Sequence, residues 1–148
     1  MNVFELLKQD HQKVSGIFQR IEAASGAGER QQLFVQLKQE LDLHAQVEET
    51  ILYPALKQAD ETRNITLEAY EEHQEVKDLL AEIQQTPPDD EEWTALVMEL
   101  RESVEHHVEE EEGEMFAQAR DVLTEEQIDE ISQRVEAAKR QAQAASAS

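Results

Sequence analysis

The sequence of 148 residues contains no cysteine, which excludes disulfide bonds, zinc–thiolate sites and cysteine-bound iron–sulfur clusters. Glycine and proline are scarce, with 4 and 3 residues, and aromatic residues make up only 5% of the chain. Few helix breakers, together with few of the residues favoured in strands, are typical of helical proteins. Glu, Gln, Ala, Leu and Lys dominate instead, so the composition predicts an all-α protein of one domain.

Basic side chains are also few, with 13 Lys and Arg against 34 Asp and Glu, which gives a formal net charge of −21. Nucleic acids and anionic membranes bind basic surfaces, so we expect neither as a partner. No stretch is long and apolar enough to span a bilayer, and the first residues lack the apolar segment of a signal peptide. We therefore expect a cytoplasmic protein.

Apolar residues spaced by threes and fours predict four long helices and a shorter fifth. Short breaks separate them, and Thr86-Pro-Pro-Asp-Asp90 is the clearest. Pro54 is expected to kink or end the second helix. The predicted ranges are about 3–24, 29–57, 62–85, 91–120 and 124–140.

Two capping patterns support these boundaries. Asp89 or Asp90 can cap the fourth helix, because a short acidic side chain accepts hydrogen bonds from the first free amides. Thr124-Glu-Glu-Gln127 has the spacing of a capping box and opens the fifth helix.

Short connections make consecutive helices antiparallel neighbours. The chain is therefore predicted to form an up-down-up-down four-helix bundle with an additional C-terminal helix. Apolar Ile128, Ile131 and Val135 favour packing of that last helix against the bundle. The predicted units are 1–120 for the bundle, 121–142 for the C-terminal helix on or beside it, and 143–148 for a frayed tail.

A set of histidines and glutamates occurs twice in the chain. In the first half a lone histidine precedes His44-x-x-x-Glu48, and in the second a lone histidine precedes His107-x-x-x-Glu111. A histidine and a glutamate four residues apart lie on one face of a helix, with Cβ atoms about 5–6 Å apart. The repeat therefore indicates a metal site built from two similar helical hairpins.

Each of the four helices carries one of these histidines at a similar distance from the turns. The four histidines are therefore expected in one interior layer, within roughly 9 Å along the bundle axis. Any one of these histidines could be an ordinary core residue, and most glutamates of so acidic a chain face solvent. Their joint placement on inward stripes favours metal binding by iron, manganese or zinc. The candidate ligands are His11, His44, Glu48, His73, His107 and Glu111.

Other residues near the repeat have plainer roles. His106 is expected to face solvent, since it lies about 100° around the helix from its neighbouring histidine. Glu49 and Glu112 directly follow the proposed ligands Glu48 and Glu111. Two roles are open for them: each could orient a ligating histidine without binding the metal itself, or lie on the surface. Tyr53 and Tyr70 could approach the site, but neither is expected to be a ligand.

With these residues, the chain resembles the hemerythrin-like family, the HHE cation-binding domains, over roughly residues 1–120. The resemblance implies a non-haem di-iron site inside a four-helix bundle, with the iron ions joined by carboxylates and an oxo or hydroxo bridge. By this resemblance the four histidines are terminal ligands and the two glutamates bridge the ions. The matching pattern is Asp10-His11, His44-x-x-x-Glu48, His73 and His107-x-x-x-Glu111.

The chain departs from the oxygen-carrying hemerythrins and looks more like a divergent bacterial branch. Those proteins have another histidine where this chain has Lys77, and an aspartate where it has Glu112. A protonated lysine cannot ligate a metal, so Lys77 either turns away or lies near a bound anion. The change argues against simple reversible oxygen carriage. Ferritin-type sites need Glu-x-x-His pairs, and this sequence has none.

These features predict a di-iron protein that binds or reacts with a small oxidant, namely dioxygen, peroxide or nitric oxide. The alternative is an iron or oxygen storage or sensing module without turnover, whose fifth helix relays the metal state to a redox or protein partner. A third reading is a structural bundle without metal. Zinc or manganese could take the place of iron in the same ligand set.

Overall fold

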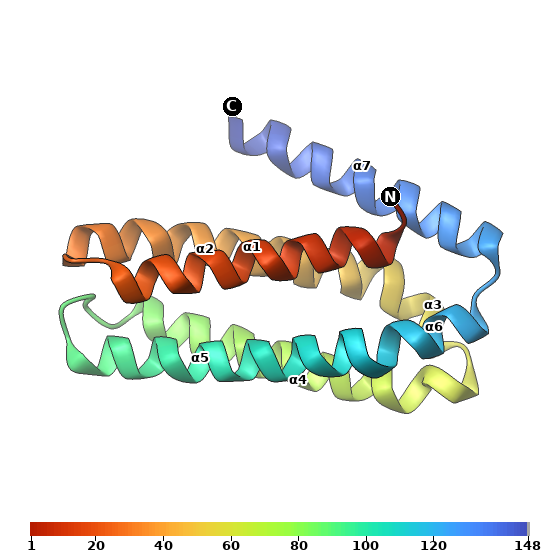
Figure 1. The fold of residues 1–148 in the computed structure, drawn as a ribbon, viewed down its shortest axis with the longest axis horizontal. Helices are drawn as coiled ribbons and strands as arrows, with labels where there is room; N and C mark the ends of the chain where they lie inside the picture. The colour runs from red at the N-terminus through yellow and green to blue at the C-terminus, as the bar shows by residue number, and fades with distance from the viewer. Residues whose placement is uncertain (148) are drawn as a thin grey trace.

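The computed structural model describes residues 1–147, which form helices and connecting turns and contain no strand (Figure 1). Two short segments are π-helical turns. The elements are α1 (Val3–Ala23), α2 (Ala27–Val47), the π turn η1 (Glu48–Leu52), α3 (Tyr53–Lys57), α4 (Asp60–Gln84), α5 (Glu91–Glu110), the π turn η2 (Glu111–Met115), α6 (Phe116–Val122) and α7 (Glu125–Ala147).

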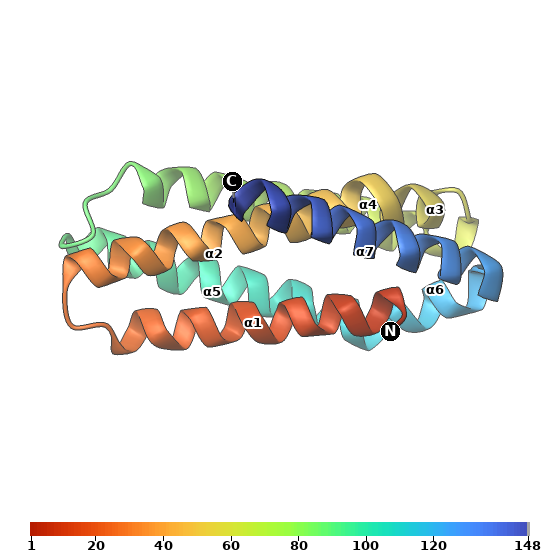
Figure 2. The same ribbon diagram turned by 90° about the horizontal axis from the view of Figure 1, so that it is seen from above.

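Four long rods run up and down and pack side by side, which confirms the predicted four-helix bundle with an extra C-terminal helix. The first rod is α1, and the second joins α2, η1 and α3 without a break. The third is α4, and the fourth joins α5, η2 and α6. The rods form two hairpins, α1 with α2 and α4 with α5, and α7 crosses outside them (Figures 1 and 2).

Local capping explains where several helices begin. The Asn2 side chain accepts a hydrogen bond from the amide of Glu5 at the start of α1. Asp90 caps α5 in the same way, as its sequence predicts. Thr124 and Gln127 form the predicted capping box, with reciprocal bonds of 2.8 and 3.1 Å.

The two π turns were not predicted, and they occur at matching places in the two halves. Each begins at a glutamate of the repeat, Glu48 in η1 and Glu111 in η2. A π turn holds one residue more than an α-helical turn and often lies at a functional site. Pro54 does not end the second rod, because it falls in the first turn of α3, where its missing amide breaks no bond of that helix.

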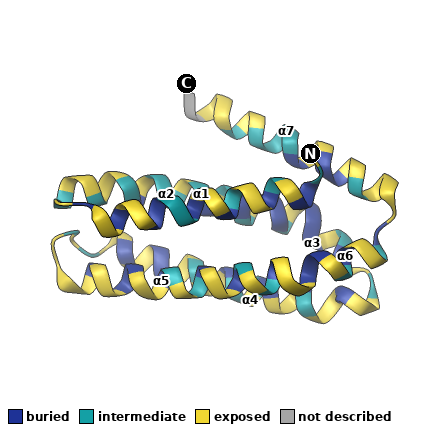
Figure 3. Ribbon diagram, in the orientation of Figure 1, coloured by how far each residue is buried: buried dark blue, intermediate teal, exposed yellow. Residues whose placement is uncertain are grey.

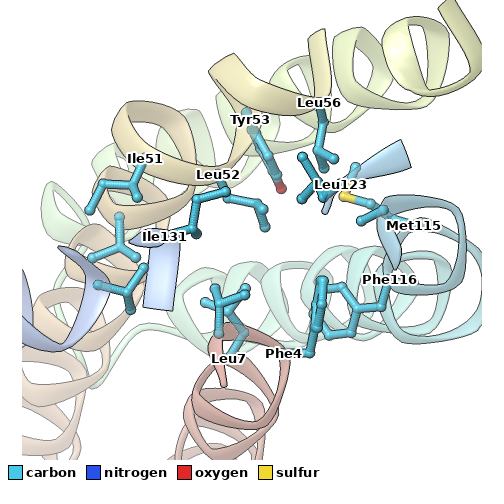
Figure 4. Packing of buried hydrophobic residues seen from close by; sticks show 14 of the residues in the cluster. Phe4, Leu7, Ile51, Leu52, Tyr53, Leu56, Met115, Phe116, Leu123 and Ile131 are labelled. Carbon is cyan, nitrogen blue, oxygen red and sulfur yellow. The ribbon is translucent and has the colours of Figure 1, made fainter. Parts of the chain in front are cut away.

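Two apolar clusters fill the bundle, one on each side of a polar layer. Their buried positions face inward on all four rods (Figure 3). One cluster surrounds η1, α3 and α6, and includes Phe4 and Phe116 with ring centres 5.1 Å apart (Figure 4). The other lies toward the opposite end and contains Phe18, Phe34 and Trp93. The predicted ligands lie between these clusters.

The first half of α7 belongs to the same core. Ile131 and Val135 are buried in the cluster around η1, and the amide of Val3 donates to the Ser132 hydroxyl at 2.7 Å. Toward its C-terminal end α7 slants away from the rods (Figure 1). It continues to Ala147, past the end predicted from the sequence, and residue 148 of the predicted tail lies outside the described residues.

Within residues 1–147, none of the helices combines the length and the apolar character that crossing a membrane requires.

Replacing Ile131 by Ala tests whether α7 is part of the folded core. The side chain is 5% exposed, so the cavity should lower the free energy of unfolding by about 2–5 kcal/mol, measured by urea denaturation. The exposed neighbour Glu130, changed to Ala, is the control and should shift stability by no more than about 0.5 kcal/mol. Equal stability of the two variants would contradict the packing of α7.

Candidate metal centre

All six candidate ligands meet in the polar layer between the two apolar clusters. Each rod supplies at least one of them: α1 and α4 one histidine each, and the second and fourth rods a histidine and a glutamate each. None is more than 8% exposed. The structure therefore brings together every residue of the predicted set: His11, His44, Glu48, His73, His107 and Glu111.

The six side chains form two groups of three. One group is His11, His44 and Glu111, and the other is Glu48, His73 and His107. Within each group the candidate ligand atoms all lie within 4.8 Å of one another. The two histidines of a group come from one hairpin and its glutamate from the other, so each group spans both hairpins.

Each glutamate also reaches a histidine of the opposite group. The contact within a hairpin is the His-x-x-x-Glu pair of the sequence, and the contact between hairpins closes the group. The nitrogen–oxygen distances are 3.0 Å for His44–Glu48, 3.1 Å for His73–Glu48, 3.1 Å for His11–Glu111 and 3.0 Å for His107–Glu111.

Several inward atoms of the layer lie close together or lack a hydrogen-bond partner. The Nε2 atoms of His73 and His107 face each other at 3.2 Å. Buried polar atoms without partners are costly and rare in proteins, whereas one cation between them would engage them together. The donor set therefore fits a metal. In the polar layer of the described structure, the buried atoms that lack a hydrogen bond are His11 Nε2, His44 Nε2, Glu48 Oε2 and Glu111 Oε1.

The outward nitrogen of every histidine in the layer contacts a carboxylate. An ionised carboxylate only accepts hydrogen bonds, so each Nδ1 carries a proton, and Nε2 is the nitrogen that faces inward and can ligate a metal once it is deprotonated. Such partners fix the orientation of a ligating histidine and raise its basicity. The four pairs are Glu112–His11 at 2.6 Å, Asp10–His44 at 3.0 Å, Glu49–His73 at 2.9 Å and Glu72–His107 at 2.7 Å.

For Glu49 and Glu112 the sequence left orientation of a histidine and a surface position open, and the structure shows the first. Sequence reasoning missed the corresponding roles of Asp10 and Glu72. A signal was present, since an acidic residue directly precedes the lone histidine in both halves of the repeat. Each carboxylate holds a histidine of another helix, and the sequence does not show that pairing.

Lys77, one helical turn after His73, contacts a carboxylate beside the candidate ligands. Its amino group donates to both Glu49 oxygens, at 3.1 and 3.0 Å, and so supports the carboxylate that holds a histidine. His106 faces solvent as predicted, with 64% of its side chain exposed. It contacts Glu110 at 3.1 Å and Glu72 at 3.5 Å on the surface of the bundle.

Tyr53 contributes a hydroxyl group inside the centre. The residue is fully buried, donates to Glu111 Oε2 at 2.9 Å, and lies 3.3 and 3.4 Å from two histidine Nε2 atoms. Burial and the nearby carboxylates of Glu48 and Glu111 raise the pKa of Tyr53, so the phenol stays protonated. The repeat has Phe116 at the matching position, which makes the two sides of the centre unlike. Tyr70 instead donates to the backbone oxygen of Glu49.

A cavity of about 40 Å³ adjoins all four histidines on the side of the Phe18 cluster. One water molecule needs about 10–15 Å³ of such space, so the cavity suits a molecule of two to four atoms. Asp10, Asp42 and Lys77 also border it. Most of the remaining lining is apolar and comprises Val14, Leu41, Ala45, Val76, Leu80, Val104 and Val108.

The carboxylates of the layer shift the pKa values of two of its histidines, His44 and His107. Burial alone would lower the pKa of His107, but hydrogen bonds to three glutamates outweigh it and raise the pKa to about 12. The pKa of His44 is also raised, because Glu48 and other carboxylates outweigh burial. Burial likewise opposes ionisation of Glu48, yet the charge of His44 and hydrogen bonds hold its pKa well below the usual value. Without metal, protons balance the negative charge of the layer.

The metal-free protein should lose stability as pH rises above the ordinary histidine pKa of 6.5. Both imidazoles are more basic in the folded state, so above pH 6.5 that state binds more protons than the unfolded chain, and raising the pH favours unfolding. The free energy of unfolding should fall by up to about 1.4 kcal/mol per pH unit for each histidine between pH 6.5 and 9. Urea titrations of chelator-treated protein at constant ionic strength measure it. A His107→Gln variant should show a shallower slope, and a flat wild-type profile would contradict the shifts.

Comparison with known proteins finds relatives over most of the chain. A protein of Nostoc sp. (strain PCC 7120) named DNA nickase is 32% identical over 139 residues, which are 94% of this chain but only 39% of that protein. The uncharacterized protein Rv2633c of Mycobacterium tuberculosis is 31% identical over 143 residues, 93% of this chain and 84% of that protein. Mb2666c of Mycobacterium bovis matches to the same extent.

A crystal structure provides the corresponding likeness in three dimensions. It is a hemerythrin HHE cation binding domain-containing protein, the Rv2633c homolog from Mycobacterium kansasii. It superposes with a TM-score of 0.86 at 28% identity, over 98% of this chain and 89% of that one. The model of the hemerythrin HHE cation binding domain matches residues 2–119, the part of the chain that holds all six clustered donors. The chain therefore belongs to the hemerythrin HHE cation-binding family, and its two His/Glu groups fit the metal binding that this family implies.

Proposed function

We propose that the chain holds two iron ions in the polar layer and binds or reacts with a small oxidant: dioxygen, peroxide or nitric oxide. The observation that carries the proposal is the pair of three-residue groups, each with buried atoms that lack hydrogen bonds, beside a cavity of about 40 Å³. The ligands would be His11, His44 and Glu111 for one ion, and Glu48, His73 and His107 for the other.

The contacts of the two glutamates support a bridging role for both. Glu48 and Glu111 each lie about 3 Å from a histidine in either group, so either carboxylate could hold both ions. Imidazole and carboxylate ligands suit iron, zinc and manganese. Iron, with an oxo or hydroxo bridge, would supply electron transfer to or from a small oxygen or nitrogen species.

The protein's own groups would select and position that species. The cavity admits only a molecule of a few atoms, and its apolar lining excludes most water. Tyr53 keeps a protonated hydroxyl at the centre, held by its bond to Glu111, and is the nearest neutral donor. The four outer carboxylates keep the histidine rings fixed, so that the site is organised before any ligand arrives.

The proposal does not extend to cutting DNA. The name DNA nickase describes a Nostoc protein of which this chain spans only 39%. A nuclease must approach phosphates, and the net charge of −21 opposes this approach. Small neutral or weakly charged oxidants meet no such barrier.

Metal content is the first test. Protein produced with iron and never exposed to chelator should contain about two irons per chain by elemental mass spectrometry. Its thermal midpoint should fall on iron removal, because a ligand present at about 100 times its Kd stabilises by roughly 2.7 kcal/mol. For a domain of this size that is roughly 5–10 °C. One ion per chain, or zinc alone, would contradict the di-iron proposal.

Peroxide turnover is the second test. It is measured as the release of oxygen from hydrogen peroxide at an oxygen electrode. A His44→Ala change removes a ligand from one group and should reduce turnover to the background rate. His106→Ala is the matched control, since this histidine is exposed and belongs to neither group. Turnover that survives His44→Ala would rule out the enzymatic version. Iron-loaded wild-type protein without turnover would favour storage or sensing.

A further inference from the structure

The C-terminal helix reaches the metal centre through one ion pair. The amino group of Lys139 on α7 contacts Oδ1 of Asp10 on α1. The other oxygen of that carboxylate, Oδ2, lies 3.0 Å from His44 Nδ1. Lys139 and Asp10 are 17% and 14% exposed, so water screens this contact much less than it screens a surface pair. A continuous path of polar contacts thus links α7 to a ligand of the centre.

Lys139 lies where α7 leaves the bundle. Before it, Ile131 and Val135 anchor the helix in the core. After it, Arg140, Gln141 and other side chains are mostly exposed, and the helix slants away from α1 and α2 (Figure 1). The ion pair lies close to this point, so movement of the outer part of α7 would disturb it.

The pair has a physical effect on the histidine. A carboxylate that accepts from Nδ1 sets the ring angle and the basicity of Nε2. Lys139 holds Asp10 by one oxygen and leaves the other aligned with His44. Without the lysine, the carboxylate would be free to rotate, and the ring of His44 would lose its fixed direction. Glu49 is also held by a lysine, but Lys77 contacts both of its oxygens and lies on α4 within the bundle.

We propose that Lys139 is a positioning residue that couples docking of α7 to metal binding at His44. Coupling between two binding events is reciprocal. Metal binding at His44 therefore strengthens docking of α7 on the bundle, and release of α7 lowers the affinity for the metal. This inference rests on the proposed metal centre. It goes beyond it by making the C-terminal helix responsive to whether the centre is loaded.

The test compares Lys139→Met, Lys139→Arg and Lys13→Met in chelator-treated full-length protein, with cobalt(II) as the probe metal. Lys13 is the control because it pairs with Glu40 at 2.8 Å, a carboxylate that holds no histidine of the centre. Competition against a coloured chelator measures cobalt affinity, and visible absorption reports the ligand field of the bound ion. Circular dichroism checks that every variant is folded.

We expect Lys139→Met to weaken binding of one cobalt ion by about tenfold, the lower end for changes behind a metal ligand, and to shift its visible bands. Lys139→Arg should restore both, and Lys13→Met should match wild type. Hydrogen exchange adds a second readout: cobalt should slow exchange of α7 amides in wild type but not in Lys139→Met.

Unchanged affinity and bands in Lys139→Met would overturn the coupling while leaving the centre intact. Failure of Lys139→Arg to restore them would also count against it. If wild-type protein binds no cobalt, the proposed centre itself fails, and the inference fails with it.

Discussion

Six ionisable side chains share one buried layer of this bundle, and burying them is costly unless each finds a partner. In each of the four histidines, Nδ1 contacts a carboxylate, and Nε2 points toward the centre of the layer. The two apolar clusters on either side of the layer provide the burial that holds the helices together around it. The four outer carboxylates keep the histidines of that layer ordered.

Much of the fold could be predicted from the sequence because its signals are local. These signals are the scarcity of glycine and proline, the apolar residues three and four positions apart, and the capping box at Thr124. Each depends only on residues that are close together in the chain. The candidate ligands could also be predicted, because the repeat places His44 and Glu48, and again His107 and Glu111, on one helix face. Both predictions depend only on which residues share a helix face, and helical periodicity is the same whether or not the helix is packed in a bundle.

The features that could not be predicted depend on contacts between helices. Nothing in the order of residues pairs Asp10 with His44 rather than with the adjacent His11. The contact of Lys139 with that aspartate spans most of the chain. The π turns had no sequence signal of their own, and they changed the outcome at Pro54, which lies inside a continuous rod. The hydrogen bond of the Tyr53 hydroxyl to Glu111 could not be predicted either, because the two groups meet only when the hairpins pack together.

The exchange of glutamates between the two hairpins has a kinetic consequence. Each group takes its histidines from one hairpin and its glutamate from the other, so an ion held by either group would cross-link the two hairpins. An ion can leave only after contacts on both sides have been broken, and the buried glutamates can move apart only if the hairpins separate locally. Metal exchange would then be limited by the opening rate of the bundle rather than by the strength of any single ligand. The lifetime of the loaded state thereby becomes a property of the whole fold.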